Sequence, residues 1–322
     1  MTETSAKILC DSVTPAGHRL TTFEGVYPRI VLAEVNTHRV FTRSSASSRA
    51  IPVEKMIRRA LEEPYVPTHW GKNQKGMQAD EDVDPDTARA AVETWLRIRD
   101  GVVEGVKDLL GLGIHKQIAN RWLEPAQWHP TLITATEWGN FFNLRDNKDA
   151  HPDFRDLAHA MRELHGKNEP KLLSASDWHL PLIFDEDWEQ AILEDPTHPT
   201  AVQSRIVKVS VGRCARISYL THDGKRDLKV DVGLHDRILA PGHMAPFEHV
   251  GRPMTKDELE LFAQKKMRWD PGNQEWYWVG SVRDDKMRSV EGEYTHFLGN
   301  VQGWVQYRKL IPFEEDILGV RP

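Results

Sequence analysis

A long amphipathic pattern beginning at residue 85 constrains the fold most. Asp84 can cap a helix, Pro85 suits its first turn, and Gly111 and Gly113 can end it. Apolar residues recur between these points at helical spacing, at Val92, Trp95, Leu96, Val103, Val106 and Leu110. The pattern therefore predicts a helix, the clearest one in the chain.

Further patterns on both sides of this helix set the fold class. Helical spacing continues over 114–124, with Ile114, Ile118 and Trp122 on one face, and over 133–145 and 152–166. It returns over 225–240, and Thr255 and Glu258 form a capping-box pair for another helix. Residues 29–35, 204–213 and 299–309 are predicted strands. The fold class is therefore α+β, with a helical block between two strand-rich segments.

Two segments look irregular. Residues 64–86 have the Pro, Gly, Asn and Asp content of a long loop, which in a compact domain is often a lid or a binding loop. Residues 194–201 (EDPTHPTA) resemble a linker. This linker divides the chain into two halves, 1–200 and 201–322.

Composition excludes several classes of protein. The chain has 42 Lys and Arg against 48 Asp and Glu, a net charge of −6, so it is no general nucleic-acid binder and any phosphate site must be a local cluster. No apolar run approaches the about 18 residues that a membrane span needs, and the first residues lack a signal-peptide pattern. Two cysteines exclude a disulfide framework and an iron–sulfur cluster, and they suit a reducing, cytoplasmic location.

No nucleophile stands out for catalysis. The Gly-x-Ser-x-Gly elbow, the Walker A pattern and the Rossmann glycine pattern are all missing from the sequence. Cys10 lies in an apolar run and Cys214 in the sequence GRCARIS, and we interpret both as packing thiols. We therefore assign no catalytic nucleophile.

The segment from His38 to Arg49 is the richest in functional groups. It holds three arginines, one histidine and four serines in twelve residues, next to an apolar run. Guanidinium groups and hydroxyls bind phosphate, especially where backbone N–H groups are free at a helix start. The alternative is a solvated basic loop, and the segment alone leaves both interpretations open.

Two further clusters carry polar groups. Residues 242–249 (GHMAPFEH) form a rigid turn with two histidines and a glutamate, but the ligand spacing of a zinc helix and a third ligand group are lacking, so no metal site is expected. Residues 113–125 and 134–145 place polar groups on successive predicted helices. In the latter, Phe141, Phe142 and Leu144 are expected to pack in the core.

Together the three clusters resemble the flavin-dependent thymidylate synthases (ThyX). Their His-Arg-x-x-Ser-x-x-x-x-Ser-x-Arg signature is matched by a set in which a threonine replaces one serine: His38, Arg39, Thr42, Ser47 and Arg49. A Gly-His-x-x-Pro-x-Glu-His turn stands at 242–249, preceded by Ala-Arg-x-Ser-Tyr at 215–219, which we interpret as a strand end. An Asn-Phe-x-Asn-Leu-Arg stretch stands at 140–145. The resemblance covers about two thirds of the chain.

The order of these motifs departs from the family. In the family the Gly-His turn precedes the His-Arg motif, whereas here it follows by about two hundred residues. We interpret this as a circular permutation or a rearranged fusion, with the two halves forming one ThyX-like unit built on a mixed sheet. Permutation is physically tolerable because chain termini usually lie at the surface.

The resemblance implies ligands and roles for these residues. It implies FAD as cofactor, methylenetetrahydrofolate as one-carbon donor, NADPH as reductant and a homotetramer with sites between subunits. His38 and Arg39 would contact the flavin on one side, and residues of the turn on the other: His243, Glu248 and His249. Ser47 and Arg49 would contact the nucleotide.

The expected base site also departs from the family. Thr37 stands where the family has its leading arginine, and Glu34 stands where it has a glutamine. Family arginines on the helix pair are replaced by Asn120, next to Arg121, and by Thr136, next to Glu137. Donors suited to uracil are thereby lost and acceptors gained, which would suit the C4 amine of cytosine.

Three functions follow for comparison. The first is C5 methylation of dUMP to dTMP, which the family favours narrowly. The second is C5 hydroxymethylation or methylation of dCMP on the same scaffold, as a virus with modified DNA would need. The third, of another class, is an inactive protein that binds a nucleotide or a flavin.

Overall fold

A five-stranded mixed sheet forms the centre of the molecule. The computed structural model describes residues 3–219, 226–264, 267–270, 275–278 and 300–311. The strands are β1 (Ser5–Val13), β2 (Arg19–Pro28), β3 (Thr42–Ser45), β4 (Trp128–Ala135) and β5 (Lys171–Leu172), in the spatial order β3-β4-β2-β1-β5. Only β1 and β5 pair in parallel; the other neighbours are antiparallel. The predicted α+β class is confirmed.

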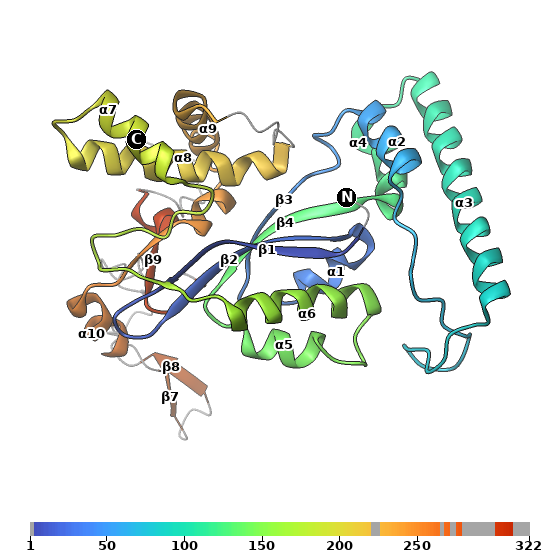
Figure 1. Cartoon of the computed structure of the whole chain (residues 1–322), viewed down its shortest axis with the longest axis horizontal. Coiled ribbons are helices and arrows are strands. Elements are labelled where there is room, and N and C mark those ends of the chain that lie inside the picture. The colour runs from blue at the N-terminus through green and yellow to red at the C-terminus, as the bar shows by residue number, and fades with distance from the viewer. Residues whose placement is uncertain (1–2, 220–225, 265–266, 271–274, 279–299, 312–322) are drawn as a thin grey trace.

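Helices lie on both faces of this sheet and at one end (Figure 1). They are α1 (Leu32–Asn36), α2 (Val53–Glu62), α3 (Pro85–Gly111), α4 (Lys116–Ala119), α5 (Gly139–Arg145), α6 (Pro152–Lys167), α7 (Asp185–Glu194), α8 (Pro199–Tyr219), α9 (Leu228–Leu239) and α10 (Lys256–Gln264). Short 3-10 helices are η1 (Arg29–Val31), η2 (Asn120–Ala126), η3 (Ala245–His249) and η5 (Tyr307–Leu310). Two small antiparallel pairs join β6 (Gly251–Pro253) to β9 (Trp304–Gln306), and β7 (Met267–Asp270) to β8 (Glu275–Trp278).

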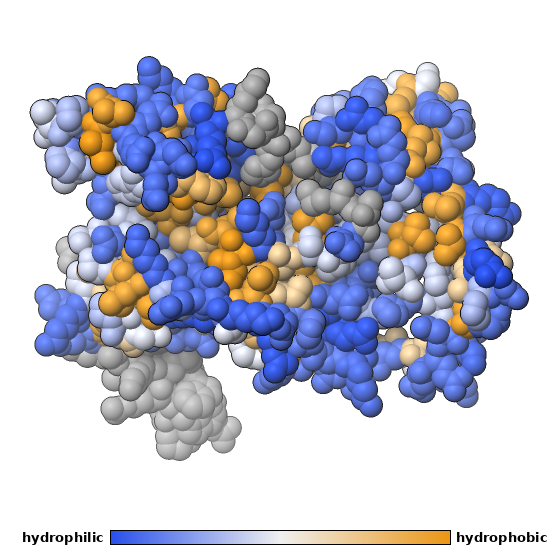
Figure 2. Space-filling view, viewed as in Figure 1, coloured by the Kyte–Doolittle hydropathy of each residue, from blue (hydrophilic) through white to orange (hydrophobic). Residues whose placement is uncertain are grey.

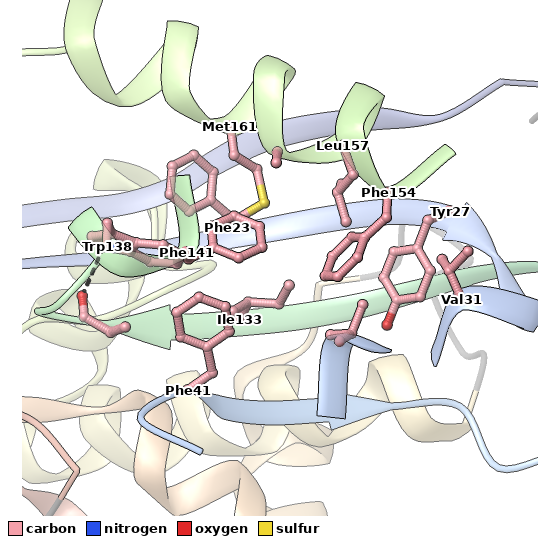
Figure 3. Packing of buried hydrophobic residues seen from close by; sticks show 13 residues of the cluster. Phe23, Tyr27, Val31, Phe41, Ile133, Trp138, Phe141, Phe154, Leu157 and Met161 are labelled. Atoms are coloured by element: carbon pink, nitrogen blue, oxygen red, sulfur yellow. Dashed lines mark hydrogen bonds between the residues drawn. The ribbon is translucent and has the colours of Figure 1, made fainter. Parts of the chain in front are cut away.

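One face of the sheet is covered by α5 and α6, with an aromatic core between them (Figure 3). Phe23 of β2 meets Trp138 edge to face, with ring centroids 5.1 Å apart. The rest of the cluster is aromatic or aliphatic and fully buried, including Tyr27, Phe41, Ile133, Phe141, Phe154, Leu157 and Met161. Burial of one such side chain contributes about 1.5–3 kcal/mol, so this cluster fixes how α5 and α6 lie on the sheet. Of the three residues expected in the core from this region, Leu144 is exposed and Phe142 is half-buried.

The opposite face carries α8, and here the strand predicted over 204–213 is wrong. Val207, Val209 and Val211 are all buried, and so is Ser210 between two of them. The helix is enclosed by α7, α9 and the sheet, so it needs no continuous polar stripe, and its alternating valines imitate the period of a strand. The Ala-Arg-x-Ser-Tyr stretch consequently ends a helix rather than a strand.

Other element boundaries also differ from the predictions. Residues 29–35 form η1 and part of α1, because β2 ends at Pro28. The helix predicted over 133–145 begins only at Gly139, after β4 has ended, and the one over 114–124 divides into α4 and η2. The strand predicted over 299–309 is limited to β9 followed by η5; residue 299 lies outside the described residues.

Locally encoded elements match their predictions. Helix α3 spans Pro85–Gly111, and the Asp84 carboxylate accepts the N–H groups of Asp86 and Thr87. Helices α6 and α9 are confirmed, and the capping box of α10 is formed by reciprocal bonds between Thr255 and Glu258. Residues 64–84 hold no helix or strand, as the long loop predicts.

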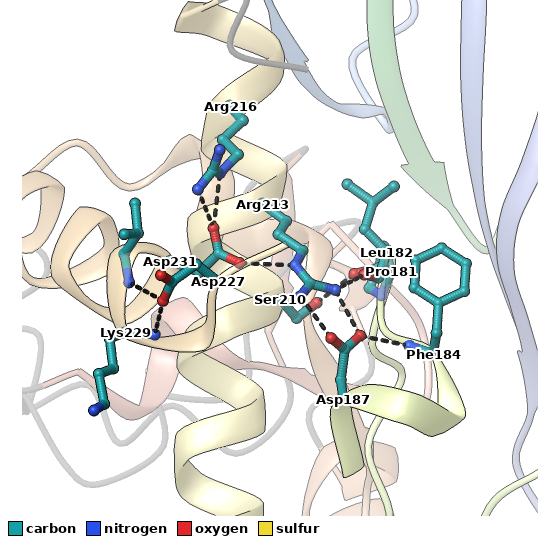
Figure 4. A network of polar contacts seen from close by, with 11 residues as sticks. Pro181, Leu182, Phe184, Asp187, Ser210, Arg213, Arg216, Asp227, Lys229 and Asp231 are labelled. Atoms are coloured by element: carbon teal, nitrogen blue, oxygen red, sulfur yellow. Dashed lines mark hydrogen bonds and ion pairs between the residues drawn. The ribbon is translucent and has the colours of Figure 1, made fainter. Parts of the chain in front are cut away.

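A buried ion network joins helices α7, α8 and α9 (Figure 4). Arg213 of α8 forms two bonds of 2.6 and 2.7 Å with the Asp187 carboxylate of α7, and its Nε donates to Asp231 of α9 at 2.9 Å. Arg216 donates to the same Asp231 at 2.7 Å. The side chain of Asp231 is 0% exposed, so two cations compensate a fully buried carboxylate.

Arg213→Met should lower the free energy of unfolding by about 3–5 kcal/mol, because it leaves the carboxylates of Asp187 and Asp231 buried without their shared cation. Arg205→Met on the same helix is the control, since its pair with Glu194 is partly exposed and should be worth about 0–1 kcal/mol. Urea unfolding measures both variants. Equal effects of the two variants would contradict the role of the network.

Candidate functional site

The two motif-bearing segments meet in space. Helix η3, which holds the end of the Gly-His turn, packs against β3, which lies within the His38–Arg49 segment. Thr42 Oγ1 donates to Glu248 Oε2 at 3.2 Å across 206 residues of sequence. Gln306 Nε2 donates to the carbonyl oxygen of Glu248 at 2.9 Å, and Arg308 ion-pairs with the Glu248 carboxylate. The fold therefore brings together segments from both halves of the chain.

A cavity of about 420 Å³ lies between β3 and the turn. Its lining residues are Arg43, Ser44, Ser45, Ala215, Ile238, His243, Met244, Ala245 and Pro246. An adjoining cavity of about 400 Å³ shares Ile238 and His243 with it and adds Arg216 and Arg237. Gly242 has a φ of 76°, a conformation that favours glycine. This explains why a glycine precedes His243 in the turn.

Each cavity is lined by one arginine without an ion-pair partner among the described residues, Arg43 in the first and Arg237 in the second. Arg43 is half-buried, and Arg237 is exposed on α9. Among the described residues, no carboxylate lies within ion-pair distance of either guanidinium. Cations that are partly desolvated and lack a counter-ion favour the binding of an anion.

His38 is held away from these cavities among aromatic rings. It stacks on Phe41 with centroids 5.4 Å apart and meets Phe141 edge to face at 5.1 Å. Burial, with Arg145 and Arg43 nearby, lowers the pKa of His38 to about 4. Arg145 Nε donates to His38 Nε2 at 3.0 Å, so the ring is neutral and carries its proton on Nδ1. Of the three histidines expected at the flavin, His38, His243 and His249, only His243 lines either of these two cavities.

The other residues expected at the flavin or nucleotide are divided between surface and interior. Arg39 and Arg49 are exposed, and Ser47 is half-buried in a turn where its carbonyl accepts from Ala50 N at 2.9 Å. Glu34 lies on α1, and its Oε2 is buried without a hydrogen-bond partner among the described residues. The two arginines are thus accessible to a phosphate.

The residues expected to read the base do not share a cavity. Asn120 is 0% exposed, and both hydrogens of its amide are used by the carbonyls of Ser48 and Ile51, at 2.8 and 3.0 Å. Arg121 ion-pairs with Glu124 at 2.8 Å. Thr136 and Glu137 follow the far end of β4, where Thr136 Oγ1 accepts from Gln302 N at 3.1 Å. In this chain Asn120 therefore fixes the turn that presents Arg49.

A buried polar chain crosses the sheet beside the turn. His249 Nδ1 is 2.8 Å from Thr134 Oγ1, which is 2.7 Å from Thr22 Oγ1. Thr22 Oγ1 is 2.8 Å from His179 Nε2, and His179 Nδ1 is 3.0 Å from Ser12 Oγ. Burial lowers the pKa of both histidines to about 3, so both rings are neutral and can each share one proton with a hydroxyl. The chain fastens η3 to β4 and β2.

The cysteines offer no nucleophile. Burial raises the pKa of the Cys10 thiol to about 11 and raises the pKa of Cys214 further above its usual range. Cys214 packs with Leu132 and Ile217 between α8 and the sheet. The interpretation of Cys214 as a packing thiol is confirmed.

Several residues that matter here were not assigned from the sequence. Arg29 binds the carbonyl of Ala46 at 3.1 Å and ion-pairs with Glu124 at 3.2 Å, so it supports the same turn as Asn120. Arg145 fixes His38, and Arg43 lines the cavity. Arg43 and Arg145 had a sequence signal, since Arg43 belongs to the Ser- and Arg-rich segment and Arg145 ends the Asn-Phe-x-Asn-Leu-Arg stretch.

Comparisons with known proteins agree with the motifs. Residues 11–171, half of the chain, match the family model described as thymidylate synthase complementing protein. This match contains the His38–Arg49 segment but not the Gly-His turn. No curated protein matches the sequence. No helix among the described residues is long and apolar enough to cross a membrane.

Solved structures with a similar arrangement include PolB, a UMP/dUMP methylase from Streptomyces cacaoi. Its complex with 5-Br UMP is 16% identical, covers 52% of this chain and 90% of that chain, and has a TM-score of 0.44. Its complex with 5-Br dUMP is also 16% identical, covers 52% and 91%, and has a TM-score of 0.42.

Acid should destabilise the fold through His179 and His249. Their pKa values are about 3 in the fold and about 6.5 in an unfolded chain, so below pH about 6.5 the unfolded state binds protons that the folded state does not. Each histidine should reduce the free energy of unfolding by about 1.4 kcal/mol per pH unit as the pH falls toward 3. His249→Gln should make this slope shallower by one histidine. Urea unfolding at pH 4–7 is the measurement, and an unchanged slope for His249→Gln would count against the buried neutral ring.

Asn120→Ala should lower the free energy of unfolding by about 2 kcal/mol, because the carbonyls of Ser48 and Ile51 lose their donors. Asn140→Ala, at an exposed position, is the matched control and should change it by less than about 0.5 kcal/mol. Urea unfolding of both variants tests the assignment. A neutral Asn120→Ala would show that the turn does not depend on this amide.

Proposed function

Because the chain belongs to the family of thymidylate synthase complementing proteins, a family of one-carbon transferases, we propose that it methylates dUMP at C5 to give dTMP. The methyl carbon would come from methylenetetrahydrofolate and the reducing equivalents from NADPH. The observation that carries the proposal is the Arg43-lined cavity formed where β3 meets the Gly-His turn. Methylation of a pyrimidine nucleotide requires sites for phosphate-bearing ligands, and in this cavity Arg43 supplies a cation without a carboxylate partner among the described residues.

The residues around this cavity fit an anionic flavin nucleotide such as FAD. Ser44 Oγ is buried and has no partner among the described residues, and Arg43 beside it has no counter-ion there. His243 would lie against the flavin from the turn, and the exposed Arg39 would bind one of its anionic groups. When bound, the flavin supplies the redox chemistry; the chain binds, orients and shields its ligands.

We also propose that the family's motifs are circularly permuted here and that 1–200 and 201–322 form one unit. The contacts of Thr42 with Glu248 and of Thr134 with His249 support this, since each joins the family-matched residues to the turn outside them. The deeply buried His249 would then help to hold the turn, while the Glu248 carboxylate, bound by Thr42 and Arg308, would fasten the turn to β3 and η5.

A homo-oligomer with shared sites is part of the proposal. Large hydrophobic side chains are exposed on and next to α3 and α4, including Ile98, Leu112, Ile118 and Trp122. Figure 2 shows hydrophobic surface on the α3 side of the molecule. Asn120 and Thr136 lie at opposite ends of β4, so a base pocket that used both positions would need more than one subunit.

Substrate choice has one alternative, C5 modification of dCMP. Glu34 and Glu137 remain acceptors that suit the amine of cytosine. Asn120 does not support this alternative, because its amide hydrogens are bound within the turn. The remaining alternative is an inactive binding protein.

The test is to incubate the purified protein with methylenetetrahydrofolate, NADPH, FAD and either dUMP or dCMP, and to identify the product by mass. We expect dTMP from dUMP. Product from dCMP alone would establish the alternative substrate. The absence of any product together with the absence of flavin binding would favour the inactive protein.

Arg49→Lys keeps the charge but loses the planar fork, so it should weaken nucleotide binding about tenfold, whereas Arg58→Lys, at an exposed position of α2, should not.

A further inference from the structure

The cavity beneath the Gly-His turn contains a guanidinium group whose orientation is fixed. Arg43 Nη1 donates to the carbonyl of Val35 at 3.0 Å and to that of His38 at 2.9 Å. Val35 lies near the end of α1 and His38 follows the helix, so one edge of the guanidinium is anchored there. Within the described residues, its other nitrogens have no hydrogen-bond partner, and they remain available to a ligand in the cavity.

Among the residues that the structure describes, no carboxylate forms an ion pair with Arg43. Glu248 is the carboxylate whose field reaches it, but Glu248 is already bound by Arg308 and Thr42. Burial lowers the pKa of Arg43, while Tyr27 and Glu248 oppose this shift, and an arginine stays charged at neutral pH. A half-buried cation of this kind gains most from an anion that enters the cavity.

The neighbouring hydroxyl is an independent sign of a ligand. Ser44 is 4% exposed and lines the same cavity, yet its Oγ has no hydrogen-bond partner among the described residues. Ser45 and His243 line the cavity as well. A buried hydroxyl without a partner costs free energy unless a bound group supplies one.

We propose that Arg43 and Ser44 form an oxyanion site that takes the phosphate of a nucleotide. A planar guanidinium and a hydroxyl match the several acceptor oxygens of a phosphate, and apolar walls from Ile238, Met244 and Pro246 can hold the body of the ligand. The proposal rests on the function proposed above and adds two binding residues to it. Two sources share this chemistry, the pyrimidine nucleotide and the flavin nucleotide.

The test compares ligands with and without phosphate. Isothermal titration measures dUMP against deoxyuridine, and FAD against riboflavin, for the parent, Arg43→Gln and Ser44→Ala. Arg43→Gln should weaken the phosphate-bearing ligand of one pair about 10- to 100-fold, and Ser44→Ala about 3- to 10-fold, with the phosphate-free member unchanged. The pair that responds identifies the source. Arg58→Gln, on the exposed face of α2, is the control and should change no ligand.

Two results would overturn the proposal. One is parent-like binding of every ligand by both variants. The other is an equal loss of both members of a pair, which would indicate a collapsed cavity. Urea unfolding checks each variant, and Ser44→Ala decides the matter if Arg43→Gln does not fold.

A measurement with inorganic phosphate tests the oxyanion site separately from the proposed methylation of dUMP. It should raise the Tm of the parent above that in chloride at equal ionic strength, and Arg43→Gln should abolish the difference. If the parent shows this effect but binds neither FAD nor dUMP, the proposed function fails and the oxyanion site stands. If phosphate has no effect and neither nucleotide discriminates the variants, the site itself is refuted.

Discussion

The junction between β3–β4 and the Gly-His turn is the constraint on which the rest of the structure depends. It is made mostly of polar side chains: Thr42 binds Glu248, and Thr134 binds His249. Such groups must be satisfied when water is removed, so their geometry tolerates few alternatives. These contacts therefore fix the position of the turn relative to β3 and β4. A cavity with a defined lining can exist between the turn and β3.

Charge is distributed around this junction in two different ways. Beyond it, Arg213 and Arg216 are bound to buried carboxylates and serve to join α7, α8 and α9. At the cavity, Arg43 and Arg237 have no such partner among the described residues. Arginine thus stabilises the packing of α7, α8 and α9 in the ion network. At the cavities, arginine provides positive charge that is available to a ligand. Arg216 belongs to both, because it binds Asp231 and also lines the second cavity.

The sequence predicted those features whose causes are local. The caps of α3 and α10 act within four residues, and both helices begin where predicted. Helix α8 was misread because residues 209–217 are all buried, so this stretch of the helix carries no amphipathic signal. In the site, the Ser- and Arg-rich segment and the turn were found by their composition and by family resemblance. The partners of Arg43, Asn120 and His38 were not, because they come from segments that meet only in the folded chain.

The contacts at the junction are compatible with the proposed permutation of the motifs. Thr42, Thr134, Glu248 and His249 interact through side chains, and none of these bonds depends on which segment is made first. The family match covers residues 11–171, and the turn enters from outside it to reach the edge strand β3 and its neighbour β4. Because β3 is an edge strand, the turn can pack there without breaking a ladder between paired strands. A connection long enough to return the turn to that edge is therefore compatible with either order of the motifs.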